Sequence, residues 1–365
     1  MKNVEKTDLF DEYQLADIKL KNRFVMAPMT RNRANADGTP TDLMAKYYAQ
    51  RAGAGLIISE ATNISDQAYG YILTPGIYKK GHIEGWKKVT SAVHEKGGKI
   101  FCQLWHCGRI SHEDVQPNTQ KPVAPSAIKA QAQAYTKEGN KDCSMPKALD
   151  ESEIKEIVGD YKKAAKAAKD ANFDGVEIHS ANGYLLHQFI ADNTNKRTDQ
   201  YGGSVENRCR LTLEVVDAIK EIWDEGRIGI RLAPVSPFND VKIDRPNITF
   251  EYLISEIDKR NLGYIHIIEG STQENRDHAD FDYDIIHESF KNTYIANNKL
   301  DLELAVKLSE QNELDLACIG RPFIANPDLV ERYLNGFDIA KPNEDTFYTG
   351  GEEGYTDYPR HDSLQ

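Results

Sequence analysis

The stretch "ESEIKEIVGDYKKAAKAAKDANFDGVEIHSA" (residues 151–181) contains one complete helix–strand unit. Apolar side chains recur at steps of three and four over 152–170, the period of an amphipathic helix, and the run "GVEIHSA" (175–181) then predicts a buried strand. Seven more strand-like runs lie at 23–28, 56–61, 100–106, 228–234, 264–270, 293–297 and 314–321. Helix-period segments separate them at 82–97, 205–224, 249–260 and 301–310, with a fainter one before the run at 293–297.

Eight strand–helix units with nearly continuous apolar strands predict a (β/α)8 TIM barrel, because parallel strands need crossover helices and a closed barrel leaves no edge. An open doubly wound sheet is the alternative fold. No GxGxxG motif follows the first strand, and such a sheet usually needs fewer units. No interdomain linker interrupts the pattern, so we expect a single domain over residues 1–365.

Two segments fall outside the eight units. The segment "YQLADIKLKN" (13–22) predicts a hairpin that caps the barrel floor. The insertion at about 107–148 contains four prolines and cannot form one regular element, so we expect it to lie over the surface after strand three.

Composition and charge exclude several classes of protein. The chain of 365 residues is 40% hydrophobic and 28% charged, and it has no apolar run long enough to span a membrane. The start "MKNVEKTDLFDEYQ" lacks the apolar core of a signal peptide. Five scattered cysteines without a CxxC pair indicate neither a disulfide framework nor a metal site, and a net charge of −12 argues against nucleic acid as a partner. We expect a cytoplasmic monomer or small homo-oligomer.

Polar residues stand at the ends of several predicted strands, where barrel enzymes build their active sites. Each has an ordinary structural explanation when taken singly, but together they would converge on one mouth. They are Thr30, Glu60, Gln103, Trp105, His179, Asn182, Tyr184, Arg231, Gly320 and Arg321.

Two of these strand ends suit an anion. In "GRPF" (320–323), Gly320 would let backbone approach a phosphate and Arg321 would bind it, although a helix start with a surface arginine is an equally good explanation. Arg231 needs a counter-charge, which could be Glu60, Glu177 or an anionic ligand ring.

Other strand ends suit hydrogen bonding. Gln103 and Thr30 could read the amide-like edge of a heterocycle, or could be ordinary polar residues near loops. In "HSANGYLLHQF" (179–189), His179 and Asn182 could hold one carbonyl or nitro oxygen while Tyr184 gives a proton. The alternative for this stretch is a polar corner that satisfies loop backbone.

Two further features of the sequence are interpreted as structural. The segment "RTDQYGGSVENR" (197–208) leads into a helix with Ser204 as its N-cap, and we expect it to position that helix and hold the preceding loop. Cys102 and Cys107 flank the end of strand three, but no base partner for a catalytic cysteine is identifiable.

Several longer motifs resemble the Old Yellow Enzyme family of FMN-dependent ene reductases, in particular its N-ethylmaleimide reductase-like bacterial members. The resemblance covers nearly the whole chain in the right order. Its motifs are "VMAPMTRNRA" (25–34), "CQLWHCGRIS" (102–111), "HSANGYLLHQFIADNTNKRTDQYGGSVENR" (179–208), "IGIRLAP" (228–234), "GRPFIANPDLVERY" (320–333) and "TFYTGGEEGYTDYP" (346–359).

The resemblance implies a role for each matching residue. The catalytic residues would be His179 and Asn182, which hold the activating oxygen of the substrate, and Tyr184, the proton donor. The FMN-binding residues would be Pro28, Thr30, Ala61, Gln103, Arg231, Asn297, Asn298, Gly320 and Arg321. The substrate pocket would include Trp105, Phe238 and Tyr348. One branch of the family has a cysteine in place of Thr30 and a second histidine in place of Asn182. Because this sequence has the threonine and the asparagine, the resemblance is to the other branch.

One stretch departs from the family pattern. Where the family has a glycine in a sequence like "AGNY", this chain reads "ANNK" (296–299). Asn297 can still offer its N–H to the FMN phosphate, and asparagine tolerates a left-handed backbone. Lys299 could add a charge there or face solvent.

The expected function is a ping-pong NAD(P)H oxidoreductase that reduces the activated C=C bond of α,β-unsaturated carbonyl or nitro compounds, with NADPH favoured over NADH as reductant. A nitrate-ester or nitro-compound reductase is the first alternative, and a non-catalytic flavin-binding barrel is the second. An aldolase is disfavoured because no strand-end lysine is available for a Schiff base.

Overall fold

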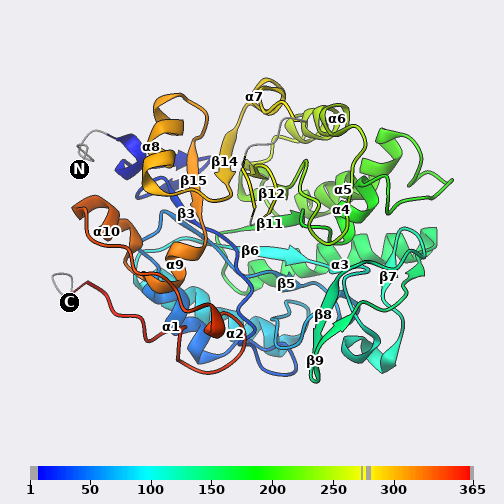
Figure 1. Cartoon of the computed structure of the whole chain (residues 1–365), viewed down its shortest axis with the longest axis horizontal. Coiled ribbons are helices and arrows are strands. Elements are labelled where there is room, and N and C mark those ends of the chain that lie inside the picture. Colours follow the sequence, from blue (N-terminus) through cyan, green and yellow to red (C-terminus); the bar gives the residue numbers. More distant parts are fainter. Residues whose placement is uncertain (1–6, 273, 277–280, 362–365) are drawn as a thin grey trace.

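Eight parallel strands close into a barrel in the computed structural model, which describes residues 7–272, 274–276 and 281–361. The strands follow chain order around the ring, and β11 pairs with both β12 and β6, so the ring is closed (Figure 1). They are β3 (Phe24–Met26), β4 (Leu56–Ile58), β6 (Ile100–Trp105), β11 (Gly175–Ser180), β12 (Ile228–Leu232), β13 (Tyr264–Ile268), β14 (Thr293–Asn297) and β15 (Leu316–Ile319). Each lies within one of the eight predicted runs, which confirms the TIM barrel and excludes the open sheet.

Helices alternate with these strands and lie around them in Figure 1. They are α1 (Asp42–Gln50), α2 (Lys80–Glu95), α3 (Glu151–Asp170), α4 (Leu185–Ile190), α5 (Val205–Lys220), α6 (Pro246–Asp258), α7 (Asp284–Ser289), α8 (Leu302–Glu310), α9 (Arg321–Ala325) and α10 (Leu329–Asn335). The 3-10 turns are η2 (Asp8–Phe10), η3 (Asp66–Ala68), η4 (Glu113–Val115), η5 (Pro117–Thr119), η6 (Glu225–Arg227) and η7 (Glu344–Thr346).

Helix α3 shows how local sequence sets these elements. Asp150 accepts hydrogen bonds from the backbone N–H groups of Ser152 and Glu153, and the Glu153 carboxylate accepts one from the Asp150 N–H. This capping box fixes the start of the helix, and the apolar face predicted from the sequence is buried in the core.

The N-terminal hairpin closes the floor of the barrel, as predicted. Strands β1 (Tyr13–Leu15) and β2 (Ile18–Leu20) pair antiparallel, and their buried leucine and isoleucine side chains pack with Val25, Phe101 and Tyr264 from the barrel strands. Residues 1–6, on which the expectation about a signal peptide partly depends, lie outside the described residues.

The insertion after β6 contains several short elements, in agreement with its proline content. An antiparallel hairpin joins β8 (Gln133–Thr136) to β9 (Gly139–Asp142), and β7 (Val123–Ala124) pairs with β10 (Lys147–Ala148). A small apolar cluster of the insertion packs against Tyr71 and Tyr184. The insertion therefore supports one wall of the barrel mouth. A two-residue strand, β5 (Thr62–Asn63), pairs with the end of β6 nearby.

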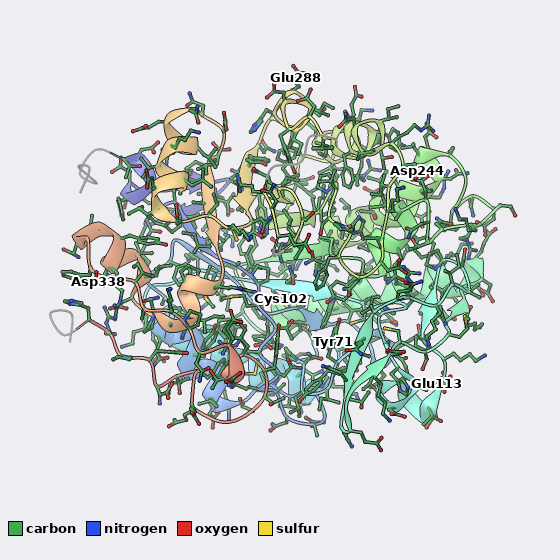
Figure 2. All side chains as sticks on the ribbon, in the orientation of Figure 1. Tyr71, Cys102, Glu113, Asp244, Glu288 and Asp338 are labelled. Carbon is green, nitrogen blue, oxygen red and sulfur yellow. The ribbon has the colours of Figure 1, made fainter. Side chains whose placement is uncertain are left out.

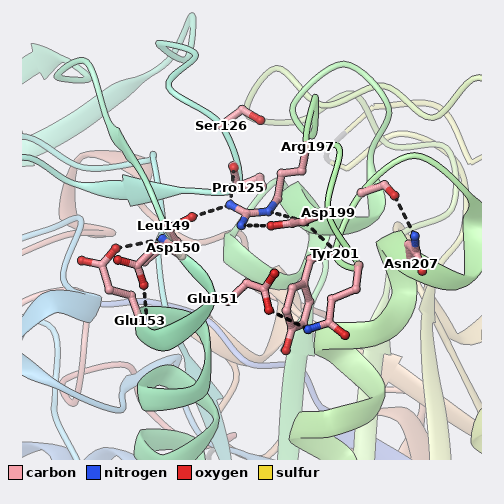
Figure 3. Close-up of polar contacts among 12 residues, drawn as sticks. Pro125, Ser126, Leu149, Asp150, Glu151, Glu153, Arg197, Asp199, Tyr201 and Asn207 are labelled. Atoms are coloured by element: carbon pink, nitrogen blue, oxygen red, sulfur yellow. Dashed lines mark hydrogen bonds and ion pairs between the residues drawn. The ribbon is translucent and has the colours of Figure 1, made fainter.

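The segment 197–208 is structural, as predicted (Figure 3). Arg197 pairs with Asp199 and donates to the backbone oxygens of Pro125 and Leu149, so it ties this segment to the insertion and to the start of α3. The Ser204 hydroxyl accepts from the backbone N–H of Asn207 and caps α5.

The interior and the periphery differ in chemistry. In Figure 2, Cys102 lies near the middle of the view, on β6 and in the main hydrophobic core, whereas the labelled acidic residues Glu113, Asp244 and Glu288 lie toward the rim of the view. All five cysteines are buried and form no disulfide. Among the described residues, no helix has the length and apolar character needed to cross a membrane.

Candidate active site

A cavity of about 340 Å³ opens at the carboxyl ends of the barrel strands. Every residue to which the resemblance gives a role lines it, whereas Glu60, which the strand ends also placed at the mouth, is buried outside the lining. The lining residues with such a role are Pro28, Thr30, Ala61, Gln103, Trp105, His179, Asn182, Tyr184, Arg231, Phe238, Asn297, Asn298, Gly320, Arg321 and Tyr348. Strands far apart in the sequence thus deliver these side chains to one place, as the barrel predicts.

The first part of the cavity, here called the β11 end, consists of His179, Asn182 and Tyr184. His179 is the fifth residue of β11, and a tight turn through Asn182 (φ 55°) and Gly183 (φ 72°) brings Tyr184 back toward it. A side chain at Gly183 would collide with the backbone oxygen of Phe238 at 2.6 Å. The His179 and Tyr184 rings lie 5.1 Å apart, so this local turn gathers the three groups at one point.

Burial sets the protonation of these groups. Removal from water, followed by the positive charge of Arg231, holds the pKa of His179 well below its ordinary value, so the imidazole is neutral. Its Nδ1 is buried without a hydrogen-bond partner among the described residues. Burial raises the pKa of Tyr184, so its phenol stays protonated and can donate. The Tyr71 hydroxyl lies 3.3 Å from that of Tyr184.

Gln103 and Arg231 form the deep part of the cavity. Gln103 Nε2 donates to Glu177 Oε1 at 2.7 Å, and because a carboxylate only accepts, this contact leaves Gln103 Oε1 as an available acceptor. Glu177 also accepts from Tyr264 and contacts His266 Nδ1 at 2.9 Å. The register of the sheet places Gln103 beside Glu177.

Neither carboxylate considered as a counter-charge for Arg231 forms a direct ion pair with it among the described residues. Arg231 Nη2 donates to Asn297 Oδ1 at 2.7 Å. Glu177 acts on it through space, partly offsetting the lowering of the Arg231 pKa by burial. Glu60 instead accepts from the Tyr48 hydroxyl at 3.2 Å. Arg231 Nε stays buried without a hydrogen-bond partner in the described residues.

The opposite part of the cavity, here called the β14–β15 end, consists of residues 297–299 with Gly320 and Arg321. The left-handed backbone considered for Asn297 occurs one residue later, at Asn298 (φ 100°) and Lys299 (φ 48°). Asn297 itself still belongs to β14. Its side-chain amide accepts from Arg231 and donates to the backbone oxygen of Cys318. The Arg321 side chain is 56% exposed, and its guanidinium forms a loose pair with Glu344 at 3.5 Å. Lys299 is exposed and lines the cavity.

Aromatic residues form the wall near the β11 end. Trp105 stacks on Tyr71 at 5.7 Å and meets the Tyr184 ring edge-on at 4.9 Å. Tyr348 is 55% exposed on the C-terminal segment, beside Phe347, which also lines the cavity.

Three contributions escaped sequence reasoning. Thr272 lines the cavity and donates to Asn182 Oδ1. Arg31 and Arg33 donate to backbone oxygens of residues 346–354 and so hold the segment that carries Tyr348. The only available signal was that both arginines lie in the motif "VMAPMTRNRA".

The two cysteines that the sequence places at the end of strand three, Cys102 and Cys107, are both buried. Burial raises the pKa of Cys102 to about 12 and also raises the pKa of Cys107, so both remain thiols at neutral pH.

Comparison with known proteins identifies the family. The model of the NADH:flavin oxidoreductase / NADH oxidase family matches residues 8–338. The chain is 40% identical to the probable flavin mononucleotide-dependent alkene reductase of Leishmania infantum, over 93% of this chain and 94% of the relative. It is similar to morphinone reductase solved in complex with tetrahydroNAD (47% identity, 98% of each chain, TM-score 0.93). It is also similar to the old yellow enzyme homologue from Zymomonas mobilis (39% identity, 97% of this chain and 100% of that chain, TM-score 0.94). The chain therefore belongs to the Old Yellow Enzyme family, as the sequence motifs predict.

Proposed function

We propose that this protein is an FMN-dependent ene reductase, which uses a reduced nicotinamide to reduce the activated C=C bond of α,β-unsaturated carbonyl or nitro compounds. The observation that carries the proposal is the β11 end, where a neutral histidine, an asparagine and a protonated tyrosine line the same cavity. Binding of a flavin alone would need no proton donor. NADPH is proposed in preference to NADH, and a cytoplasmic location is proposed from composition.

The deep part of the cavity fits the flavin ring. The pyrimidine edge of a flavin carries an N–H between two carbonyl groups. Gln103 Oε1 can accept a hydrogen bond from this N–H, and the Arg231 guanidinium can donate to a carbonyl oxygen. The unpartnered Arg231 Nε supports this assignment, since a buried donor is expected to have an acceptor when the site is filled. Thr30, Pro28 and Ala61 would contact the ring from the strand ends.

The β14–β15 end fits the FMN phosphate. Asn297, Asn298, Gly320 and Arg321 would hold it, the first three through backbone and the last through charge. When bound, FMN supplies the two-electron redox chemistry, and the protein supplies binding, orientation and protons.

The β11 end would bind the activating oxygen of the alkene. His179 and Asn182 would donate hydrogen bonds to this carbonyl or nitro oxygen, stabilise the charge that develops there and so make the β-carbon electron-poor. Tyr184 would give its phenolic proton to the α-carbon. Arg231 would stabilise negative charge on the reduced cofactor. Trp105, Phe238 and Tyr348 would surround the substrate and limit its contact with water.

A spectroscopic titration tests this function. We expect the purified protein to be yellow, to lose its colour anaerobically with NADPH, and to regain it when cyclohexenone is added. Protein that carries no flavin would contradict the proposal. Recovery of colour with a nitrate ester but not with cyclohexenone would favour the alternative reductase.

A further inference from the structure

The orientation of the Asn182 amide decides whether the β11 end can hold an oxygen. Oδ1 and Nδ2 are almost the same size, but only Nδ2 carries hydrogens. An amide turned the wrong way would present an acceptor to the oxygen of the substrate and repel it. Neighbouring groups must therefore fix which atom faces the substrate.

Two hydroxyl groups contact this amide in sequence. Thr272 Oγ1 lies 2.8 Å from Asn182 Oδ1. Ser236 Oγ lies 2.7 Å from Thr272 Oγ1 and accepts the backbone N–H of Thr272 at 3.0 Å. Ser236 is buried, and Thr272 lies on the loop that follows β13.

The hydrogen count favours one direction along this chain of groups, because only that direction pairs both hydroxyl hydrogens within the described part of the protein. If Thr272 donates to Asn182 Oδ1, its oxygen accepts from Ser236, and both hydroxyl hydrogens are used. If the amide were turned over, Thr272 would accept from Asn182 and donate to Ser236. Ser236 would then accept twice, and within the described residues no acceptor for its own hydrogen is seen. A buried unpaired hydroxyl is unfavourable, so the first arrangement prevails.

The backbone of Asn182 is fixed as well. Its carbonyl oxygen accepts from Asn239 Nδ2 at 2.8 Å, which holds the left-handed turn in place. With Oδ1 bound by Thr272 and the carbonyl bound by Asn239, Nδ2 has no partner among the described residues and remains the donor of a side chain that lines the cavity.

We propose that Thr272 and Ser236 are positioning residues, which orient Asn182 so that Nδ2 donates to the oxygen of the substrate. This inference rests on the proposed function of the β11 end. Neither hydroxyl needs to touch the substrate, because each acts through the next group in the chain from Ser236 to Thr272 to Asn182.

Thr272→Val is the direct test, because valine keeps the shape and removes the hydroxyl. We expect the variant to bind FMN normally and to bind 4-chlorophenol about fivefold more weakly, the loss typical of one hydrogen bond. Binding is followed by the change in flavin absorbance. Thr272→Ser keeps the hydroxyl and is expected to bind the phenol like the wild type, which separates loss of the hydrogen bond from a disturbed loop.

A double-mutant cycle with Asn182→Ala shows whether Thr272 acts through Asn182. Without the amide, Thr272→Val is expected to cause no further loss of phenol binding. Three results would each overturn the inference. The first is a phenol affinity of Thr272→Val equal to that of the wild type, and the second is a loss of affinity in Thr272→Ser as large as in the valine variant. The third is an effect of Thr272→Val on phenol affinity that is undiminished in the Asn182→Ala background. If the wild type reduces cyclohexenone, such a result leaves the proposed function intact. If the wild type does not, the proposed function itself fails.

Discussion

The two ends of the cavity are built in different ways. At the β11 end, His179 is 3% exposed, and Asn182 and Tyr184 are held by hydrogen bonds to neighbouring side chains. At the β14–β15 end, the groups are a left-handed backbone turn and an arginine that is 56% exposed. The strand order places β11 and β15 on opposite sides of the barrel.

This difference matches the work proposed for each end. Stabilising a developing charge requires donors that are oriented before the reaction and shielded from water, since reorientation would add to the barrier. Holding a dianionic phosphate requires charge and backbone donors but no change during turnover. We therefore expect substitutions at the β11 end to lower the rate and substitutions at the β14–β15 end to weaken cofactor binding.

The largest effect is expected from removing both oxygen ligands. The double variant His179→Ala with Asn182→Ala should lower kcat/KM for cyclohexenone about 10³-fold, because loss of even one such donor commonly costs two to three orders of magnitude. FMN content should remain that of the wild type. Steady-state kinetics and the flavin absorbance per protein measure the two quantities. Normal turnover of enones by this variant would show that the oxygen binds elsewhere.

The groups removed in this variant were predictable from the sequence, for a physical reason. The strand runs and helix periods are local patterns, so all eight strands were found. Barrel geometry then requires that their carboxyl ends share one mouth, which is why His179, Gln103 and Arg231 could be grouped without any knowledge of distances.

The supporting contacts were not predictable, because they join residues far apart in the sequence. Thr272 reaches Asn182 across 90 positions, and Arg31 holds the carbonyl of Phe347 across 316 positions. For Arg231, the charge suggested Glu60, Glu177 or a ligand as partner, and the sequence did not indicate the hydrogen bond that it donates to the amide of Asn297. Such pairings depend on the packing of the whole barrel and leave no periodic signal.

A second prediction separates proton transfer from substrate binding within the β11 end. Tyr184→Phe should slow reoxidation of the reduced protein by cyclohexenone about 10²-fold, the typical contribution of a general acid, and should leave reduction by NADPH unchanged. Stopped-flow absorbance of each half-reaction provides the measurement. Equal slowing of both halves would argue against a role as proton donor.

Tyr71→Phe is the matched control for this prediction. It removes the other hydroxyl of the same hydrogen-bonded pair, 3.3 Å away, from a residue outside the lining of the cavity. We expect only a modest slowing, since Tyr184 keeps its proton. If Tyr71→Phe slowed reoxidation as much as Tyr184→Phe, Tyr184 could not be assigned as the donor.

The smallest effect is expected at the β14–β15 end. Arg321→Ala should raise the dissociation constant of FMN about tenfold, because one charge-assisted hydrogen bond to a solvent-exposed phosphate is lost. The loss should shrink as ionic strength rises, since salt screens exposed charges. Once saturated with FMN, the variant should reduce cyclohexenone at the wild-type rate. Fluorescence titration of the apoprotein with FMN at low and high salt measures the affinity.

Arg360→Ala serves as the control for a general effect of charge. Arg360 is 46% exposed and has a loose carboxylate partner at 3.7 Å, much like Arg321 with its partner at 3.5 Å, but it does not line the cavity. Its removal changes the net charge equally and should leave FMN affinity unchanged. A fall in the FMN-saturated rate of Arg321→Ala would mean that the two ends are coupled, because a group that holds only phosphate cannot alter chemistry on the opposite side of the barrel.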